Sequence, residues 1–484
     1  MAAASSASRS RWGSPFAWPA SSCSPPVAAA PPAARRDRSP PRTLNTVAPT
    51  RSIAGERVAY VGARLLDPSA GLDAPGGVLT EGEAIIDFGP HVTAGSIPGD
   101  AEVVHCNGYC LAPGLVDIRV QLREPGEEHK GTLASGGRAA TAGGITSMVC
   151  LPNTNPVMDD NSVVEFVARR ARLLGLTKVY PYAAVTTGLE GVNLAEMGML
   201  AEAGAVAFTD GVKAIPSARV MRQALLYART YGLLIVEHAE EPTLAAGGCM
   251  NSGELATRLG LVGIPREAEV IIVERDIHLV RMTGGRLHFA HLSTAAAIDA
   301  VRQAKRSGIA VTCDTAPPYF AMNENAIGEY RTFAKLSPPL RAEEDRLAVI
   351  AGLVDGTIDA IASDHAPEDE DAKRLPFAQA AFGGIGLETL LAVSLELYHN
   401  GHLALLDVLR LITCGPAAIM ALPAGRLARG ARADLTLFDP ERAWQVREHE
   451  LYSKSKNTPF DYRPVQGRVL MTVIDGRRVF ALGA

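Results

Sequence analysis

The chain has 484 residues, of which 47% are hydrophobic and 20% charged, and its formal net charge is -5. This composition is typical of a globular protein and opposes nucleic-acid binding, and the length exceeds one ordinary domain. No apolar run reaches the roughly 18 residues that a membrane-spanning helix needs. Seven scattered cysteines predict reduced thiols and a cytoplasmic location rather than a disulfide framework.

Residues 1–54 are rich in Ala, Ser, Pro and Arg and show no periodic pattern. This composition predicts a disordered extension. Arg-rich, Ser-rich and acid-poor segments also occur as organelle transit peptides, but the density of Pro opposes an amphipathic helix. We therefore favour a long extension over a transit peptide.

Short strands separated by Gly, Pro and Asp turns are predicted near both ends of the chain. They cover residues 57–61, 78–82, 84–88, 432–439 and 469–476. Two such clusters on either side of a long α/β region predict one small composite β-domain, a β-sandwich. We place it at residues 55–113 together with 420–484.

Between these clusters, short apolar strands alternate with helical periodicity. The predicted strands are residues 115–120, 145–151, 179–185, 205–209, 233–237, 287–291, 310–313 and 360–363. The clearest helices are predicted at 161–174, 217–231, 266–283 and 294–307. About eight βα units are what a TIM (β/α)8 barrel needs, so the sequence predicts an α/β barrel over residues 114–419.

The first predicted barrel strand carries polar residues on one face. Alternation along residues 115–120 and beyond places Asp117, Arg119 and Gln121 on the same side. Buried polar groups without partners cost free energy, so this face is either the wet side of an edge strand or the floor of an active site.

Four acidic or imidazole side chains lie at the ends of four further strands. In a TIM barrel the chemistry sits at the carboxyl ends of the strands, so these side chains are expected to converge. Imidazole and carboxylate together suit zinc or a related divalent ion. The four residues are His238, His291, Asp364 and Asp210.

Several separated motifs resemble the dihydroorotase family of the amidohydrolase superfamily. They are Leu122–Gly126 (Leu-Arg-Glu-Pro-Gly), Pro152–Pro156 (Pro-Asn-Thr-Asn-Pro), Asp364–Pro367, Phe382–Thr389 and Ser453–Phe460. The resemblance implies the reversible closure of carbamoyl aspartate to dihydroorotate in de novo pyrimidine biosynthesis. It also implies metal binding by His238, His291, Asp364 and Asp210, with Asp364 also moving the proton.

The resemblance further implies that Arg123 and Asn153 contact the carboxylate of the substrate. Arg offers a bidentate fork for a carboxylate. The alternatives are a structural ion pair of Arg123 with Glu124 or Asp117, and simple turn chemistry for Asn153.

The chain departs from the family pattern inside the expected site. Arg119 and Gln121 stand where the family has its two first-strand metal-binding histidines, and Glu368 stands where it has a second histidine for the substrate. Arg has no lone pair to give a cation, so a binuclear zinc centre is not expected. Either a single zinc ion is held by His238, His291 and a carboxylate, or Arg119 pairs with Asp364 or Asp210 and no metal binds.

Three functions stay open at this point. The first is dihydroorotase-type ring chemistry with an altered metal site. The second is a non-catalytic subunit that scaffolds aspartate transcarbamoylase, as in family members that have lost metal histidines. The third is another ring amidohydrolase, such as a hydantoinase or allantoinase, which the absence of Lys at the end of the fourth strand opposes. A homo-oligomer is expected, with no nucleic-acid or membrane partner.

Overall fold

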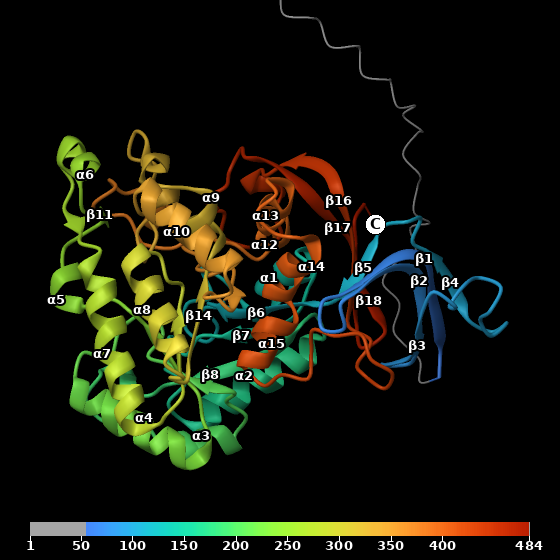
Figure 1. Cartoon of the computed structure of the whole chain (residues 1–484), viewed down its shortest axis with the longest axis horizontal. Helices are drawn as coiled ribbons and strands as arrows, with labels where there is room; N and C mark the ends of the chain where they lie inside the picture. Colours follow the sequence, from blue (N-terminus) through green and yellow to red (C-terminus); the bar gives the residue numbers. More distant parts are fainter. Residues whose placement is uncertain (1–54, 484) are drawn as a thin grey trace, which may run out of the picture. The chain divides into compact units, whose positions relative to one another are not determined.

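The computed structural model describes residues 55–483, and the extension predicted to be disordered, residues 1–54, lies outside them. The centre of the described region is a barrel of eight parallel strands that pair in chain order (Figure 1). The strands are β6 (Leu115–Val120), β7 (Ile145–Cys150), β8 (Lys178–Ala183), β9 (Ala207–Phe208), β10 (Ile235–His238), β13 (Leu287–Ala290), β14 (Val311–Thr315) and β15 (Ala360–Ile361). The predicted TIM barrel is confirmed, and each strand overlaps its predicted range.

The barrel closes between its last and first strands. Val120 forms a parallel bridge with His365, and the Gln121 amide donates to the His365 carbonyl over 2.8 Å. Beneath this bridge, the buried Asp117 carboxylate accepts hydrogen bonds from the Ser363 and Arg119 amides, at 3.1 and 3.2 Å. The polar first strand is therefore the seam of the barrel, and not an edge strand.

Helices cover the outside of the barrel. They include α1 (Leu133–Ala142), α2 (Asn161–Leu174), α3 (Met197–Glu202), α4 (Ala218–Tyr231), α7 (Glu267–Thr283), α8 (Ala295–Arg306), α10 (Glu343–Val354), α12 (Leu390–Ser394), α13 (Glu396–His399), α14 (Leu405–Ile412) and α15 (Cys414–Ile419). In α2, Asp160 caps the first turn and Gly175 ends the helix in a left-handed conformation, as its sequence predicts. Val163, Val164 and Val167 form its buried face.

Strands from both ends of the chain form a second sheet, the terminal sheet. Its strands are β1 (Arg57–Asp67), β2 (Leu72–Glu81), β3 (Ala84–Gly89), β4 (Glu102–His105), β5 (Cys110–Pro113), β16 (Leu435–Gln445), β17 (Pro464–Ile474) and β18 (Arg477–Ala481). β5 pairs with β16, which joins the strands from the two ends of the chain (Figure 1). Along one edge of β1, the first half pairs with β4 and the second half with β5, so the sheet branches at β1. The predicted sheet built from both ends of the chain is confirmed, but it is one branched sheet and not a two-sheet sandwich; the division into two domains and their boundaries stay predictions.

Shorter elements interrupt the βα pattern beyond the strand ends. After β10 the chain forms α5 (Pro242–Ala245), β11 (Met250–Asn251), α6 (Glu254–Leu259) and β12 (Gly263–Ile264). α9 (Pro317–Ala321) follows β14, and α11 (Glu370–Arg374) follows β15. The segments carrying these elements extend the walls of the barrel mouth. No helix in residues 55–483 is long and apolar enough to cross a membrane.

Candidate active site

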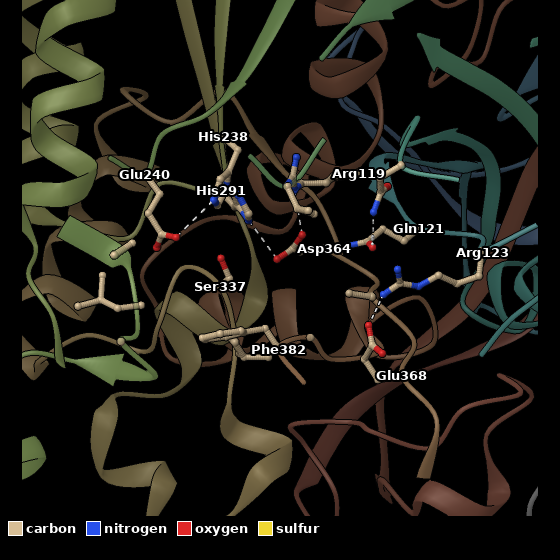
Figure 2. Close-up of a pocket in the computed structure, with 18 of the residues that line it drawn as sticks. Arg119, Gln121, Arg123, His238, Glu240, His291, Ser337, Asp364, Glu368 and Phe382 are labelled. Atoms are coloured by element: carbon tan, nitrogen blue, oxygen red, sulfur yellow. Dashed lines mark hydrogen bonds and ion pairs between the residues drawn. The ribbon is translucent and has the colours of Figure 1, made fainter. Parts of the chain in front are cut away.

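A cavity of about 390 Å³ opens at the carboxyl ends of the barrel strands. Residues that follow β6, β7, β10, β13 and β15 line one part of it, and the connecting segments line the rest (Figure 2). The predicted site residues at its wall are Arg119, Gln121, Arg123, Asn153, His238, His291 and Asp364. The sequence prediction that these strand ends meet in space agrees with this arrangement.

Three of these residues have an unusual backbone. Arg123, His291 and Asp364 adopt positive φ angles of 66°, 41° and 51°. Such angles are uncommon outside glycine and cost roughly 1–3 kcal/mol where the surroundings enforce them. Each residue lies just beyond a barrel strand, where the chain turns sharply and aims the side chain at the cavity.

Arg119 and Asp364 form an ion pair in which the Arg119 side chain is buried and the Asp364 side chain is 17% exposed. The Arg119 Nε donates to Asp364 Oδ1 over 2.9 Å, and Nη2 donates to the Gly211 carbonyl over 3.2 Å. Burial opposes ionisation of Asp364, but His291 and Arg119 together lower the pKa of this carboxyl below its ordinary value. Because Arg119 stays protonated, Asp364 is ionised at neutral pH.

The two histidines contact each other and Asp364. His291 Nδ1 lies 3.1 Å from Asp364 Oδ2, and His291 Nε2 lies 2.7 Å from His238 Nδ1. Burial, assisted by the charge of Arg119, lowers the pKa of His291 to about 4, so its ring is neutral at pH 7. A neutral ring has one N–H, so Nδ1 donates to Asp364, and Nε2 accepts from His238.

These residues do not fit a metal centre. No group of three His, Cys, Asp or Glu side chains in residues 55–483 is arranged to hold an ion. Two imidazole nitrogens on one tetrahedral zinc would be about 3.3 Å apart, from Zn–N bonds near 2.05 Å, whereas here the two nitrogens lie at hydrogen-bond distance, 2.7 Å. The guanidinium of Arg119 also places a fixed positive charge beside Asp364.

Asp210 is not brought into the cavity. Its Oδ1 accepts from the Val185 and Thr186 amides, at 3.1 and 2.9 Å, and its Oδ2 accepts from the Thr186 hydroxyl. Burial raises its pKa. In this arrangement Asp210 orders the segment after β8, and the metal-ligand role expected from the resemblance stays a prediction.

Arg123 and Asn153, which were expected to contact the carboxylate of the substrate, both form hydrogen bonds within the protein. Arg123 donates to the Glu127 and Glu368 carboxylates and to the Pro367 carbonyl. It pairs with neither of the local partners considered from the sequence, Glu124 and Asp117. Asn153 Nδ2 donates to Gln121 Oε1 over 3.0 Å, so Gln121 positions Asn153 at the cavity wall.

Sequence reasoning missed part of the cavity wall. Glu240 lies 3.8 Å from His238 Nε2, and Ser337 and Phe382 lie opposite the strand ends (Figure 2). Glu240 follows His238 by two residues, so its place in the sequence was a usable signal. Ser337 comes from an irregular segment, whose course no periodic pattern predicts, whereas Phe382 begins the matched motif Phe382–Thr389 and could have been proposed from it.

Comparison with known proteins agrees with this architecture. Residues 108–297 match the family described as Dihydro-orotase-like, and residues 348–480 match the Amidohydrolase family. Among solved structures, the L-hydantoinase (dihydropyrimidinase) from Arthrobacter aurescens superposes with a TM-score of 0.79 at 23% identity, covering 89% of this chain and 97% of that one. At this identity the likeness shows the fold alone.

Curated relatives are more similar in sequence. A dihydroorotase from Anaplasma phagocytophilum (strain HZ) is 47% identical over 426 residues, which are 87% of this chain and 95% of that protein. A dihydroorotase from Wolbachia sp. subsp. Drosophila simulans (strain wRi) is 44% identical, covering 88% of this chain and 96% of that protein. With the barrel, the terminal sheet and the matched motifs, these relatives show that the chain belongs to the dihydroorotase family.

Proposed function

We propose that the chain acts in pyrimidine biosynthesis as a dihydroorotase-type protein whose cavity takes carbamoyl aspartate and dihydroorotate. Dihydroorotase relatives that share nearly half of the sequence support this assignment. The observation that carries it is the ionised Asp364, held between His291 and Arg119 at the barrel mouth. The six free cysteines among residues 55–483 fit a cytoplasmic protein.

In this proposal, side chains of the protein carry out the reaction without a metal ion. In the hydrolytic direction, water attacks the ring amide carbonyl, Asp364 accepts the proton of this water, and the ring nitrogen receives it as the C–N bond breaks. Arg119 supplies the positive charge that stabilises the oxygen of the tetrahedral intermediate. His291, neutral and bonded to Asp364, holds the carboxylate in place.

A non-catalytic subunit is the second candidate function. The same Arg119–Asp364 ion pair favours it, because a carboxylate already neutralised by a guanidinium is a weak base. In this case the chain binds and organises aspartate transcarbamoylase, and the cavity has a structural or ligand-sensing role.

Dihydroorotate hydrolysis by the purified chain, with added zinc and with chelator, separates these functions. We expect slow turnover at the same rate in both conditions, and loss of turnover in Asp364→Asn. Turnover that requires zinc would contradict the metal-independent site. If folded protein shows no turnover in either condition, the scaffold function is favoured, and co-purification with aspartate transcarbamoylase becomes the next measurement.

A double substitution tests the replacement of metal by guanidinium. Arg119→His with Gln121→His restores the two first-strand imidazoles and removes the fixed charge next to Asp364. We expect this variant to bind zinc, measured as metal content after dialysis, and the unmodified chain to bind none. Equal metal content in both proteins would contradict the proposed role of Arg119.

A further inference from the structure

The second arginine of the cavity is held by a carboxylate of the protein itself. The Arg123 Nη2 donates to Glu368 Oε1, Nη1 donates to Glu127 over 2.9 Å, and Nε donates to the Pro367 carbonyl over 3.1 Å. Figure 2 shows Arg123 and Glu368 facing each other at the wall of the cavity. Every nitrogen of this guanidinium therefore already has an acceptor.

Glu368 is fixed in this position from several sides. Its side chain is 7% exposed, and its second oxygen lies 3.2 Å from Lys130 Nζ. Its amide donates to Asn457 Oδ1, and the Asn457 amide group donates to the Ala366 and Gly383 carbonyls. Two cations and the hydrogen bonds of Asn457 therefore fix Glu368 in one position at the cavity wall.

Both permanent cations at the cavity wall already pair with a carboxylate of the protein. Among the described residues that line it, the permanent cations are Arg119 and Arg123, and each is bonded to a carboxylate, Asp364 or Glu368. Glu240 adds a further carboxylate, whose pKa is lowered by His238 against the opposing effect of burial. A carboxylate ligand that enters the cavity therefore meets net negative charge, and it finds the guanidinium of Arg123 already bonded to Glu368.

We propose that Glu368 is an internal occupant of the carboxylate subsite that Arg123 offers. The proposal rests on the function proposed above and deepens it, because it says how the cavity treats the carboxylate of dihydroorotate. The substrate carboxylate reaches Arg123 only by displacing Glu368. Glu368 is thus a specificity-determining residue, and it removes the preference for a carboxylated ring over the same ring without the carboxylate.

Binding of two rings that differ only in this group tests the proposal. Dihydroorotate and dihydrouracil are titrated calorimetrically into the full chain, into Glu368→Gln and Glu368→Ala, and into the control Glu127→Gln. Glu127 is the other carboxylate on Arg123, but it does not line the cavity. Glu368→Gln keeps the shape of the side chain and guards against a folding defect in Glu368→Ala.

We expect the unmodified chain and Glu127→Gln to bind both rings within about threefold of each other. In the two Glu368 variants, the preference for dihydroorotate rises tenfold or more, which equals about 1.4 kcal/mol. A preference of tenfold or more in the unmodified chain that the Glu368 variants leave unchanged would overturn the proposal.

A second measurement decides the matter if neither ring binds any of the proteins, in which case the proposed function fails. Acetate is then titrated and thermal stability is measured. The proposal stands if acetate stabilises Glu368→Ala saturably, but neither the unmodified chain nor Glu368→Ala combined with Arg123→Gln. Absence of an acetate effect on folded Glu368→Ala overturns it.

Discussion

The two ion pairs at the cavity wall are held in different ways. Arg119 and Asp364 lie at the seam between the first and last barrel strands, next to the hydrogen bonds of Asp117 that close the barrel. Arg123 and Glu368 lie on connecting segments and share their charges with Lys130 and neighbouring carbonyls. The first pair is part of the framework, whereas the second can change with little effect on the barrel and so adjusts what the cavity accepts.

The largest effect is expected at the seam. Arg119→Met keeps most of the volume but leaves the Asp364 carboxylate, which is 17% exposed, without its cation, and this costs roughly 3 kcal/mol of stability, the lower end of the range for breaking a buried pair. Denaturant unfolding measures this loss. Arg374→Met, which removes a cation that is 71% exposed and paired with the 72% exposed Glu370, is the control and should cost less than about 1 kcal/mol. Equal losses in the two variants would remove the distinction between framework and surface pairs.

A smaller loss is expected for the pair on the connecting segments. Arg123→Gln removes the charged hydrogen bonds to Glu127 and Glu368, but Lys130 still contacts both carboxylates. The expected cost is about 1.5–3 kcal/mol, the usual range for hydrogen bonds to charged groups. If unfolding shows a loss as large as that of Arg119→Met, both pairs belong to the framework and the comparison fails.

The connecting segments should also give stability a pH dependence. Lys373 on α11 is buried and donates to the carbonyls of Thr332, Lys335 and Ala381, and burial lowers its pKa to about 7. In the unfolded chain it stays protonated to about pH 10.4. The unfolded chain therefore binds more protons above pH 7, and stability gains up to about 1.4 kcal/mol per pH unit from this group.

Unfolding free energies of the unmodified chain and of Lys373→Met, measured between pH 7 and 8.5, isolate this contribution. The difference between the two proteins should change with pH, since the variant has no group to titrate. Parallel curves would show that Lys373 keeps the same charge in the folded and unfolded chain.

The smallest effect is expected at Asp210. Asp210→Asn keeps one oxygen for the Val185 and Thr186 amides and loses the charge, so stability should fall by about 1 kcal/mol. Dihydroorotate binding should not change, because Asp210 does not line the cavity. A tenfold loss of dihydroorotate binding at unchanged stability would show that Asp210 takes part in the site.

Periodicity and strand ends predicted most of the framework. The first strand was predicted at residues 115–120 and the helix at 161–174, and β6 and α2 have these bounds. Convergence of His238 and His291 follows from the rule that parallel strands present their carboxyl ends together. The barrel could therefore be read from local patterns, because its contacts repeat with each βα unit.

The ion pairs were harder to predict. The pairing of Arg119 with Asp364 was one of two outcomes that the sequence left open, since the sequence of one strand does not show which distant group its arginine meets. Glu368 lies 245 positions from Arg123, on a segment without periodic pattern, and nothing local links them. The contacts of Asp210 were equally hard to predict, because its strand, β9, ends after two residues and its side chain turns back toward the segment after β8.

The terminal sheet has a consequence for synthesis of the protein. β5 lies before the barrel in sequence, yet its partner β16 begins at Leu435 and is translated only after the whole barrel. On the ribosome, the edge of β5 therefore stays open while more than three hundred residues are added. An open strand edge is a template for pairing with other chains. Polypeptides that stop before Leu435 are thus expected to aggregate even though they contain all the barrel strands. Only chains that are translated to full length can complete this sheet.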